Sequence, residues 1–212
     1  MPLYLFGVAL VALVAISASG AWAQRRRRRA GVSVPIRSIV ESGPARVRGE
    51  VTCAAPLLAP LTGRRCAYVR IEFHCESMGR IHRYAWSERR DFSIADASGH
   101  AQVLVERAEF EVVADIIQMG RVADLTAAQR ATIAQFQWSL PPIGPIELCE
   151  AVVEVGATIE VAGVAANDID PTPANGARGY RDGPAMTPIF QRDVFISDGR
   201  RDRVWIAPSS GG

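Results

Sequence analysis

The sequence predicts a mainly β protein, either an OB-like barrel or a small β-sandwich with a helical insert, preceded by one N-terminal transmembrane helix. Short β-type runs separated by Gly, Pro and Asp fill most of the chain after residue 45. One stretch near 122–138 is rich in helix formers, and the first 24 residues carry no charged side chain. From the N-terminus, the sequence predicts an anchor at 1–24, a basic flank and linker at 25–45, a β domain at 46–207 and a tail at 208–212.

The anchor is predicted from the apolar segment between Leu3 and Ala23. A helix rises about 1.5 Å per residue, so this segment is long enough for the roughly 30 Å hydrocarbon core of a bilayer. Ala21-Trp22-Ala23 imitates a signal-peptidase site, but no positive side chain precedes the apolar run as a secretory signal requires. We therefore expect an uncleaved anchor; a cleaved signal with a basic mature N-terminus stays open as the alternative.

The orientation of the anchor is predicted from the arginine run that follows it. These side chains are Arg25, Arg26, Arg27, Arg28 and Arg29. Cytoplasmic flanks of membrane helices are enriched in Lys and Arg, and anionic headgroups attract such clusters. The sequence thus predicts contact with the lipid bilayer through residues 1–29, with the N-terminus outside and the rest of the chain in the cytoplasm.

The remaining chain is net acidic and shows no sign of nucleic-acid binding. All 22 acidic residues follow Arg29, whereas five of the 24 basic ones belong to the arginine run. Aromatic residues make up 7% of the chain. Single-stranded nucleic acids are bound by basic grooves with stacking aromatics, so we expect no nucleic-acid partner. Four dispersed cysteines, none in a C-x-x-C pair, are expected to be reduced thiols in a cytoplasmic core.

The first strands are expected at 46–53 and 64–75. RVRGEVTC alternates like a strand, with Gly49 as a bulge or a point of close backbone approach. In RRCAYVRIEFHC, alternation places Cys66 and Tyr68 on one face and Val69 and its alternate neighbours on the other. A turn from Asp96 to Gly99 is then expected to join two short antiparallel strands.

A helical insert is expected near 122–138. Asp124 and Thr126 are both N-cap candidates, and Leu125, Ile133 and Phe136 are its apolar residues. Two β runs follow in LCEAVVEVGATIEVAGVA (148–165), hinged at Gly156. Residues 166–188, dense in Pro, Gly, Asn and Asp, predict an exposed polar loop.

In order and spacing, five segments together resemble the GIDE family, the "beside a membrane" domain of a mitochondrial E3 ubiquitin ligase and its bacterial relatives. The segments are VRGEV, APLTGRRCAYVRIEF, FSIADASGHAQV, EAVVEVGATIEVAGVA and VFISD, which span most of residues 47–198. The resemblance implies that the signature residues determine the fold and that the membrane is a bacterial inner membrane. Those residues are Gly49, Pro60, Gly63, Cys66, Tyr68, Phe92, Asp96, Gly99, Glu150, Gly156 and Gly163.

The resemblance does not extend to the zinc-binding RING that gives the eukaryotic ligase its activity. A RING holds two tetrahedral zinc ions with eight Cys or His ligands, whereas this sequence has four Cys and three His. The predicted function is therefore a membrane-anchored scaffold that binds protein or lipid, with no cofactor and with a protein partner still to be identified.

Two enzymatic alternatives remain: a ligase-type activity inherited from the family, and a Cys-dependent hydrolase. The hydrolase would use Cys66 or Cys149 as nucleophile and His74, His82 or His100 as base. A zinc site at His74, Cys75 and His82, with Cys66 as the fourth ligand, is disfavoured, because adjacent His74 and Cys75 point to opposite faces of a strand.

Overall fold

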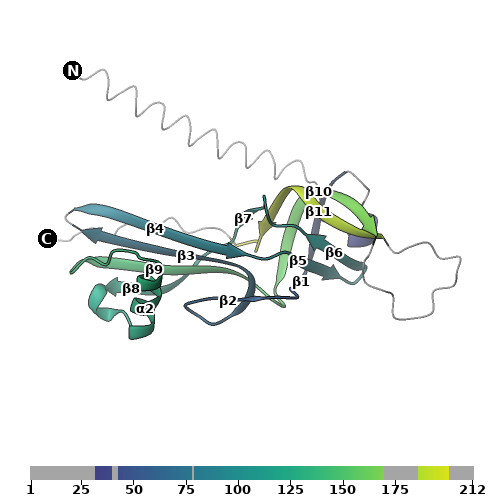
Figure 1. Cartoon of the computed structure of the whole chain (residues 1–212). Coiled ribbons are helices and arrows are strands. Elements are labelled where there is room, and N and C mark those ends of the chain that lie inside the picture. The colour runs from purple at the N-terminus through teal and green to yellow at the C-terminus, as the bar shows by residue number, and fades with distance from the viewer. Residues whose placement is uncertain (1–31, 40–42, 78, 170–185, 201–212) are drawn as a thin grey trace, which may run out of the picture.

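The computed structural model describes residues 32–39, 43–77, 79–169 and 186–200. They form a closed five-stranded β-barrel and, beside it, a second five-stranded sheet with one α-helix (Figure 1). The elements are η1 (Ile36–Ser38), β1 (Pro44–Thr52), β2 (Leu57–Leu58), β3 (Arg65–Ser77), β4 (Arg80–Arg89), β5 (Phe92–Asp96), β6 (Gly99–Val103), β7 (Glu109–Glu111), β8 (Asp115–Arg121), η2 (Val122–Asp124), α2 (Ala127–Gln135), β9 (Pro145–Glu154), β10 (Thr158–Ile169) and β11 (Met186–Ser197).

The barrel closes in the order β1-β5-β6-β11-β10 and back to β1. Neighbouring strands are antiparallel except for β6 and β11, which are parallel, and β7 adds to β11 outside the ring. On β1, β5 and β6 every second side chain points inward, as the period-two pattern requires, whereas the pairing of β10 with β11 contains register shifts. The core is built from buried residues of every barrel strand, including Val47, Val51, Ile94, Val103, Val161, Phe190 and Ile196.

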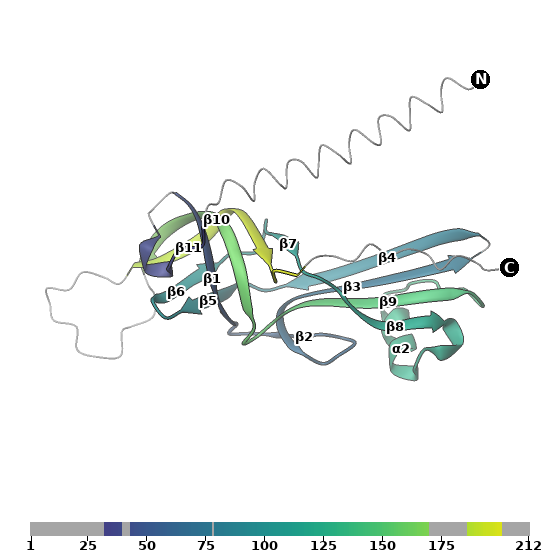
Figure 2. The same cartoon turned by 180° about the vertical axis from the view of Figure 1, so that it is seen from behind.

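Two insertions into the barrel sequence build the second sheet. Strands β2, β3 and β4 lie between β1 and β5 in the chain, and β8, α2 and β9 lie between β6 and β10. The sheet order is β4-β3-β9-β8, with β2 on the barrel-side end of β3. Figures 1 and 2 show this sheet extending away from the barrel, so that the molecule is long and has the barrel at one end.

One face of the second sheet is covered by α2 and the residues that follow it. Leu125 and Ile133 are buried against this face, and Phe136 is partly buried there. Phe136 and Trp138 also contact aromatic side chains of the sheet, with ring centroids 4.6 Å apart for Trp86 and Phe136. The helix therefore lies within the predicted range. It buries Ile133, and the flanking residues Leu125 and Phe136 also pack on the sheet.

The N-cap of α2 is Thr126, one of the two predicted candidates. Its hydroxyl accepts a hydrogen bond from the Gln129 amide at 3.2 Å, and the Gln129 side chain accepts one from the Thr126 amide at 2.8 Å. This reciprocal pair satisfies two amides that a helix start leaves without intrahelical partners. Asp124 instead accepts a hydrogen bond from the Arg121 amide, at 2.7 Å.

Three details of the predicted layout are wrong. Cys66 and Tyr68 do not share a face, because a register shift between them places Cys66 in the core beside α2 and Tyr68 in the barrel core. Such a one-residue β-bulge reverses the alternation on one side of it. The segment predicted as a linker includes Ile36, which is 1% exposed in the barrel core.

The third correction concerns the predicted loop at 166–188. Its first residues belong to β10 and its last to β11, which pair through to Ile169 and Met186. Residues 170–185 lie outside the described part of the chain.

Candidate functional site: buried polar groups between the barrel and the second sheet

The thiol of Cys66 is buried and lacks the surroundings of a nucleophile. It is 0% exposed and lies 3.8 Å from the Leu57 carbonyl oxygen, to which it donates. Burial, followed by the negative charge of Glu150, raises the pKa of Cys66 to about 11, and Arg64 offsets this only in part. A reactive cysteine needs an accessible thiol with a lowered pKa, so Cys66 is a core residue.

The second candidate nucleophile, Cys149, faces a carboxylate instead of an imidazole. Its thiol lies 3.5 Å from Glu147, which is itself buried, and burial together with Glu147 raises the pKa of Cys149 to about 12. His74 lies on the neighbouring strand, with its Nδ1 3.6 Å from Glu147. A negative neighbour destabilises the thiolate, so this group cannot activate Cys149.

His74 and Cys75 point to opposite faces of β3, as predicted. Cys75 is buried in the core beside α2, whereas His74 lies on the opposite face with Glu72 and Glu147. Within the described ranges, no group of three or more His, Cys, Asp or Glu side chains is arranged to hold a metal ion.

Glu150, one of the signature residues, is fully buried in β9 and ties the turn before β3 to the sheet. Its carboxylate accepts a hydrogen bond from the Leu61 amide at 2.9 Å and another from the Thr62 hydroxyl. The Arg64 guanidinium lies 3.7 Å away. A buried carboxylate is tolerated only when it is paired and hydrogen-bonded, and here all three partners come from one short segment.

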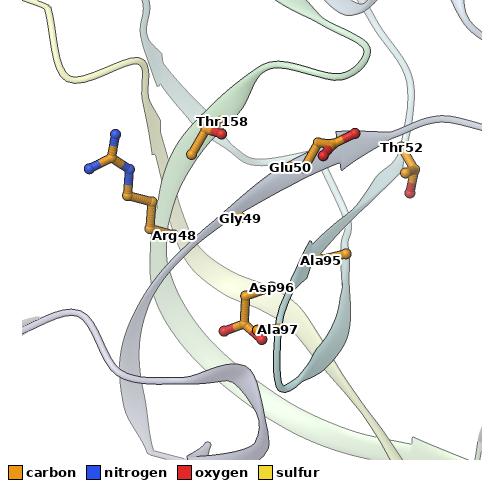
Figure 3. Close-up of a pocket in the computed structure, with 8 residues that line it drawn as sticks. All are labelled: Arg48, Gly49, Glu50, Thr52, Ala95, Asp96, Ala97 and Thr158. Carbon is orange, nitrogen blue, oxygen red and sulfur yellow. The ribbon is translucent and has the colours of Figure 1, made fainter.

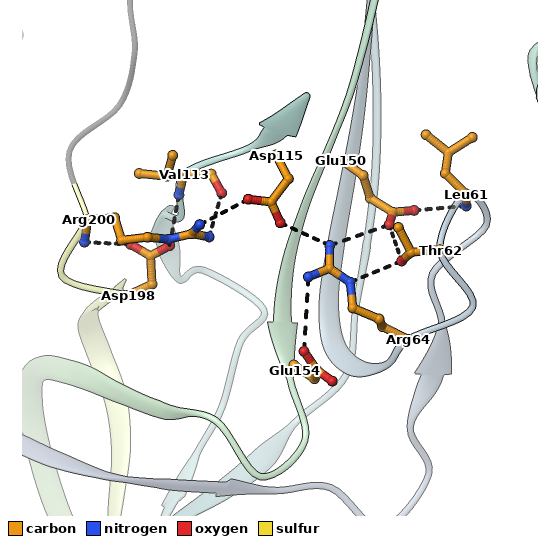
Figure 4. Close-up of polar contacts among 9 residues, drawn as sticks. All are labelled: Leu61, Thr62, Arg64, Val113, Asp115, Glu150, Glu154, Asp198 and Arg200. Carbon is orange, nitrogen blue, oxygen red and sulfur yellow. Dashed lines mark hydrogen bonds and ion pairs between the residues drawn. The ribbon is translucent and has the colours of Figure 1, made fainter. Parts of the chain in front are cut away.

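Arg64 continues this contact into a chain of charges that reaches the barrel (Figure 4). It binds Asp115, the first residue of β8, at 3.2 Å, and Asp115 also binds Arg200 at 2.9 Å. Arg200 in turn binds Asp198, just after barrel strand β11, at 2.9 Å. We name Glu150, Arg64, Asp115, Arg200 and Asp198 the junction network.

The junction network fixes the second sheet to the C-terminal end of β11. Asp198 accepts a hydrogen bond from the Val113 amide at 3.1 Å, and Arg200 donates to the Val113 carbonyl oxygen at 3.0 Å. Burial tends to raise the pKa of Asp115, but Arg200 and Arg64 outweigh this and hold it below its usual range. The two aspartates and Arg200 were not predicted, because 85 residues separate Arg200 from Asp115 and no local pattern connects them.

Asp96 organises a second junction, between the β5–β6 turn and the N-terminal segment. Its Oδ1 accepts hydrogen bonds from the amide and hydroxyl of Ser98, both at 2.6 Å, and from the Gly99 amide at 3.1 Å. Its Oδ2 accepts one from the Ile36 amide at 2.9 Å. The predicted role of tying its own turn is confirmed, and the same carboxylate also positions the buried Ile36.

A shallow depression of about 570 Å³ lies beside this turn on the outside of the barrel (Figure 3). It is lined by Arg48, Gly49, Glu50, Thr52, Ala95, Asp96, Ala97 and Thr158. The charged side chains of Arg48, Glu50 and Asp96 spread apart in Figure 3 instead of converging. This arrangement offers a surface with both charges but no focused binding site for one small group.

The other signature residues also have structural positions. At Gly49 a side chain would place Cβ 2.6 Å from the Ala95 carbonyl oxygen, so this glycine permits the close approach of β1 and β5 that was one of its two predicted roles. Gly156 turns the chain between β9 and β10 with a φ of 88°. The remaining members are Pro60 and Gly63 in the turn before β3, Tyr68 stacked on Phe110, Phe92 in the barrel core, and Gly163 at the irregular β10–β11 register.

The predicted membrane anchor, residues 1–24, and the run Arg25–Arg29 lie outside the described residues. Among the described residues, no helix combines the length and apolarity needed to cross a bilayer.

Comparisons with known proteins identify no relative of this chain. A scan against protein-family models finds no match, and searches among curated proteins and solved structures find none either.

Proposed function

We propose that this protein is a membrane-tethered β scaffold, whose barrel and second sheet are held in a fixed arrangement to present a surface to a binding partner. The main observation in support of this proposal is that the buried carboxylates bind other parts of the fold. Glu150 and Asp96, which are the signature carboxylates, bind backbone and side-chain groups of the fold. Chemistry needs groups that reach a substrate, whereas these groups maintain a shape.

The particular family that we propose is the GIDE type without its RING. Its signature residues coincide with close approaches, turns and buried contacts that determine this fold. We also assign the barrel to the OB class, supported by five strands closed through one parallel contact between β6 and β11.

The proposed location is the cytoplasmic face of a bacterial inner membrane, with residues 1–24 spanning it and the N-terminus outside. The support is the uncharged segment and the five arginines that follow it. The partners proposed are lipid at residues 1–29 and a protein bound to the folded part.

The Cys-dependent hydrolase is disfavoured by the geometry of both candidate thiols. Cys66 is sealed in the core, and Cys149 faces Glu147. A ligase-type activity has no support in the described residues, where no zinc-ligand cluster occurs.

Nucleic-acid binding is disfavoured by the outward side chains of the barrel. On β5 and β6 these are Ser93, Ala95, His100 and Gln102, which pair across the two strands. Base stacking requires several aromatic side chains, and of these four residues only His100 has an aromatic ring.

The proposal is tested by photo-crosslinking in cells that express the full chain. Benzoylphenylalanine is placed at Glu50 or Gln102, which are exposed on the barrel. We expect a discrete protein adduct from at least one position, and its retention in Cys66→Ala, with Cys53→Ala as the matched control. Absence of any protein or lipid adduct, or loss of a cellular phenotype in Cys66→Ala with unchanged folding, would contradict a scaffold and favour an enzyme.

A further inference from the structure

Three exposed apolar side chains lie at the end of the second sheet that is farthest from the barrel. Ile81 follows the β3–β4 turn, Met119 is near the end of β8, and Ile143 precedes β9. They are 45%, 57% and 79% exposed, respectively. Figures 1 and 2 both show the β3–β4 turn, the start of β9 and the end of β8 at this end of the molecule.

The strand register brings these three segments into one surface. Ile81 pairs with Glu76, and the next residue of β3 inward, Cys75, pairs with Ile146 of β9. Ile146 pairs in turn with Gly120, the neighbour of Met119. Strands in a sheet are about 4.8 Å apart, so the ends of β4, β3, β9 and β8 form one continuous edge.

Ile143 belongs to the same surface because its loop contacts the β3–β4 turn. A Cβ at the adjacent Gly144 would lie 2.4 Å from the Glu76 carbonyl oxygen, so the two backbones touch. We name Arg80, Ile81, Arg83, Met119, Arg121 and Ile143 the distal tip.

The arginines of the distal tip give it a positive character. Arg80, Arg83 and Arg121 are exposed, and none forms an ion pair with another described residue. Three carboxylates lie nearby. Glu76 is opposite Ile81, the buried Glu147 is opposite Met119, and Asp124 accepts a hydrogen bond from the Arg121 amide. Exposed aliphatic side chains surrounded by arginines are typical of surfaces that enter the headgroup region of anionic membranes.

We propose that the distal tip inserts into the headgroup region of an anionic lipid bilayer. This inference rests on the proposed membrane tether and names lipid as the partner of one surface. The chain enters the fold through η1 and β1 at the barrel, whereas the distal tip is at the opposite end (Figure 1). Two contacts with one membrane would lay the long axis along the bilayer and leave the sides of the barrel accessible to a protein partner.

The charge and the shape of the distal tip both favour lipid as its partner over an extended peptide. Anionic headgroups attract each nearby arginine, and the aliphatic side chains gain from leaving water. An extended peptide would instead bind backbone groups along the outer edge of β4 or β8, whereas the tip is defined by side chains at the ends of these two strands and in the loop before β9.

The test uses the full chain reconstituted in vesicles of phosphatidylglycerol and phosphatidylethanolamine, and separately in phosphatidylcholine vesicles. Benzoylphenylalanine is placed at Ile143 or, as a control, at Gln102 on the barrel. After illumination, lipid adducts are counted by mass spectrometry. We expect adducts at 143 in the anionic vesicles, at least fivefold fewer in phosphatidylcholine, and few at 102.

Charge variants separate the tip from the tether. Arg80→Gln and Arg121→Gln should each lower the adduct yield at 143 about fivefold, because an arginine near an anionic surface contributes about 1 kcal/mol. Arg107→Gln, which removes an exposed arginine between β6 and β7, should leave the yield unchanged.

The inference is overturned if position 143 gives no lipid adduct in anionic vesicles or gives equal yields in both lipids. It is also overturned if the same labelled chain, illuminated in native membranes, crosslinks at position 143 to a protein or to a second copy. Failure of the tether would look different, because a carbonate wash would then release the full chain from the vesicles.

Discussion

Replacing Glu150 by alanine should strongly destabilise the fold. The carboxylate is 0% exposed, and its loss leaves the Leu61 amide and the Thr62 hydroxyl without their acceptor and removes a negative partner of Arg64. Hydrogen bonds to charged groups contribute about 1.5–3 kcal/mol each, and breaking a buried pair costs about 3–5 kcal/mol. We expect the free energy of unfolding to fall by about 3–5 kcal/mol.

The matched control is Glu154→Ala, which removes the other β9 carboxylate beside Arg64. Its side chain is 48% exposed and 4.0 Å from the guanidinium, so its removal should cost less than about 1 kcal/mol. A third variant, Glu150→Gln, keeps one acceptor oxygen and should lie between the two.

The assay is urea denaturation of the full chain in detergent micelles, followed by the fluorescence of Trp86 and Trp138, which contact Phe136. In a thermal scan the same loss corresponds to a lower melting temperature, by about 2–4 °C per kcal/mol for a domain of this size. Equal effects of Glu150→Ala and Glu154→Ala would refute the reasoning that the junction network stabilises the fold.

Three further outcomes follow from the same contacts. Gly49→Ala should lower the free energy of unfolding by about 1–3 kcal/mol, because its Cβ would meet a carbonyl oxygen. In the control Gly99→Ala the Cβ has no neighbour closer than 3.9 Å, so the free energy of unfolding should change by less than about 0.5 kcal/mol. Equal values for the two variants in denaturant titrations would contradict the close approach of β1 and β5. Burial tends to raise the pKa of Asp96, but its hydrogen bonds outweigh this and lower it, so its stabilisation is complete above the unfolded pKa of about 3.9 and is lost as pH falls through the lower folded pKa. Acid titration should therefore show a smaller stability loss below about pH 4 in Asp96→Asn than in the parent protein, and identical curves would argue against this role. In mass-spectrometric maleimide labelling of the native protein, Cys53, which is partly exposed, should react before the buried Cys66; comparable rates would mean that the core opens readily.

The β character, the β5–β6 turn and the helical insert could be predicted because their signals are local. Alternating apolar residues indicate strands, and Asp96 to Gly99 has the composition of a turn. Thr126 and Gln129 have the spacing of a capping box, which marks the start of a helix. Each of these features depends on residues that are neighbours in the sequence.

The errors arise where one residue changes the register or where distant segments meet. The β-bulge between Cys66 and Tyr68 changes which face of the sheet the side chains after it occupy. The alternation of apolar residues in the sequence does not reveal this extra residue. Ile36 is buried in the barrel core and donates its amide hydrogen to Asp96, 60 residues away, so a segment with linker composition joins the core through contacts that no local pattern reveals.

The junction network shows the same limit for the candidate site. The family resemblance indicates Glu150, whereas its connection through Arg64 to Asp115 and Arg200 appears only in the folded chain. Charged residues in a sequence are far more often solvated than paired in this way. The sequence alone therefore does not indicate which of its charged residues form the junction network.

The central claim, a scaffold tethered with its folded part in the cytoplasm, is tested most directly by membrane topology. A C-terminal tag on the full chain is exposed to protease in spheroplasts and in lysed cells, and the mass of the membrane-bound product is measured. The account predicts a tag that is protected in spheroplasts and a product that retains residues 1–23. A tag digested in spheroplasts, or a product that begins at Gln24, would contradict it.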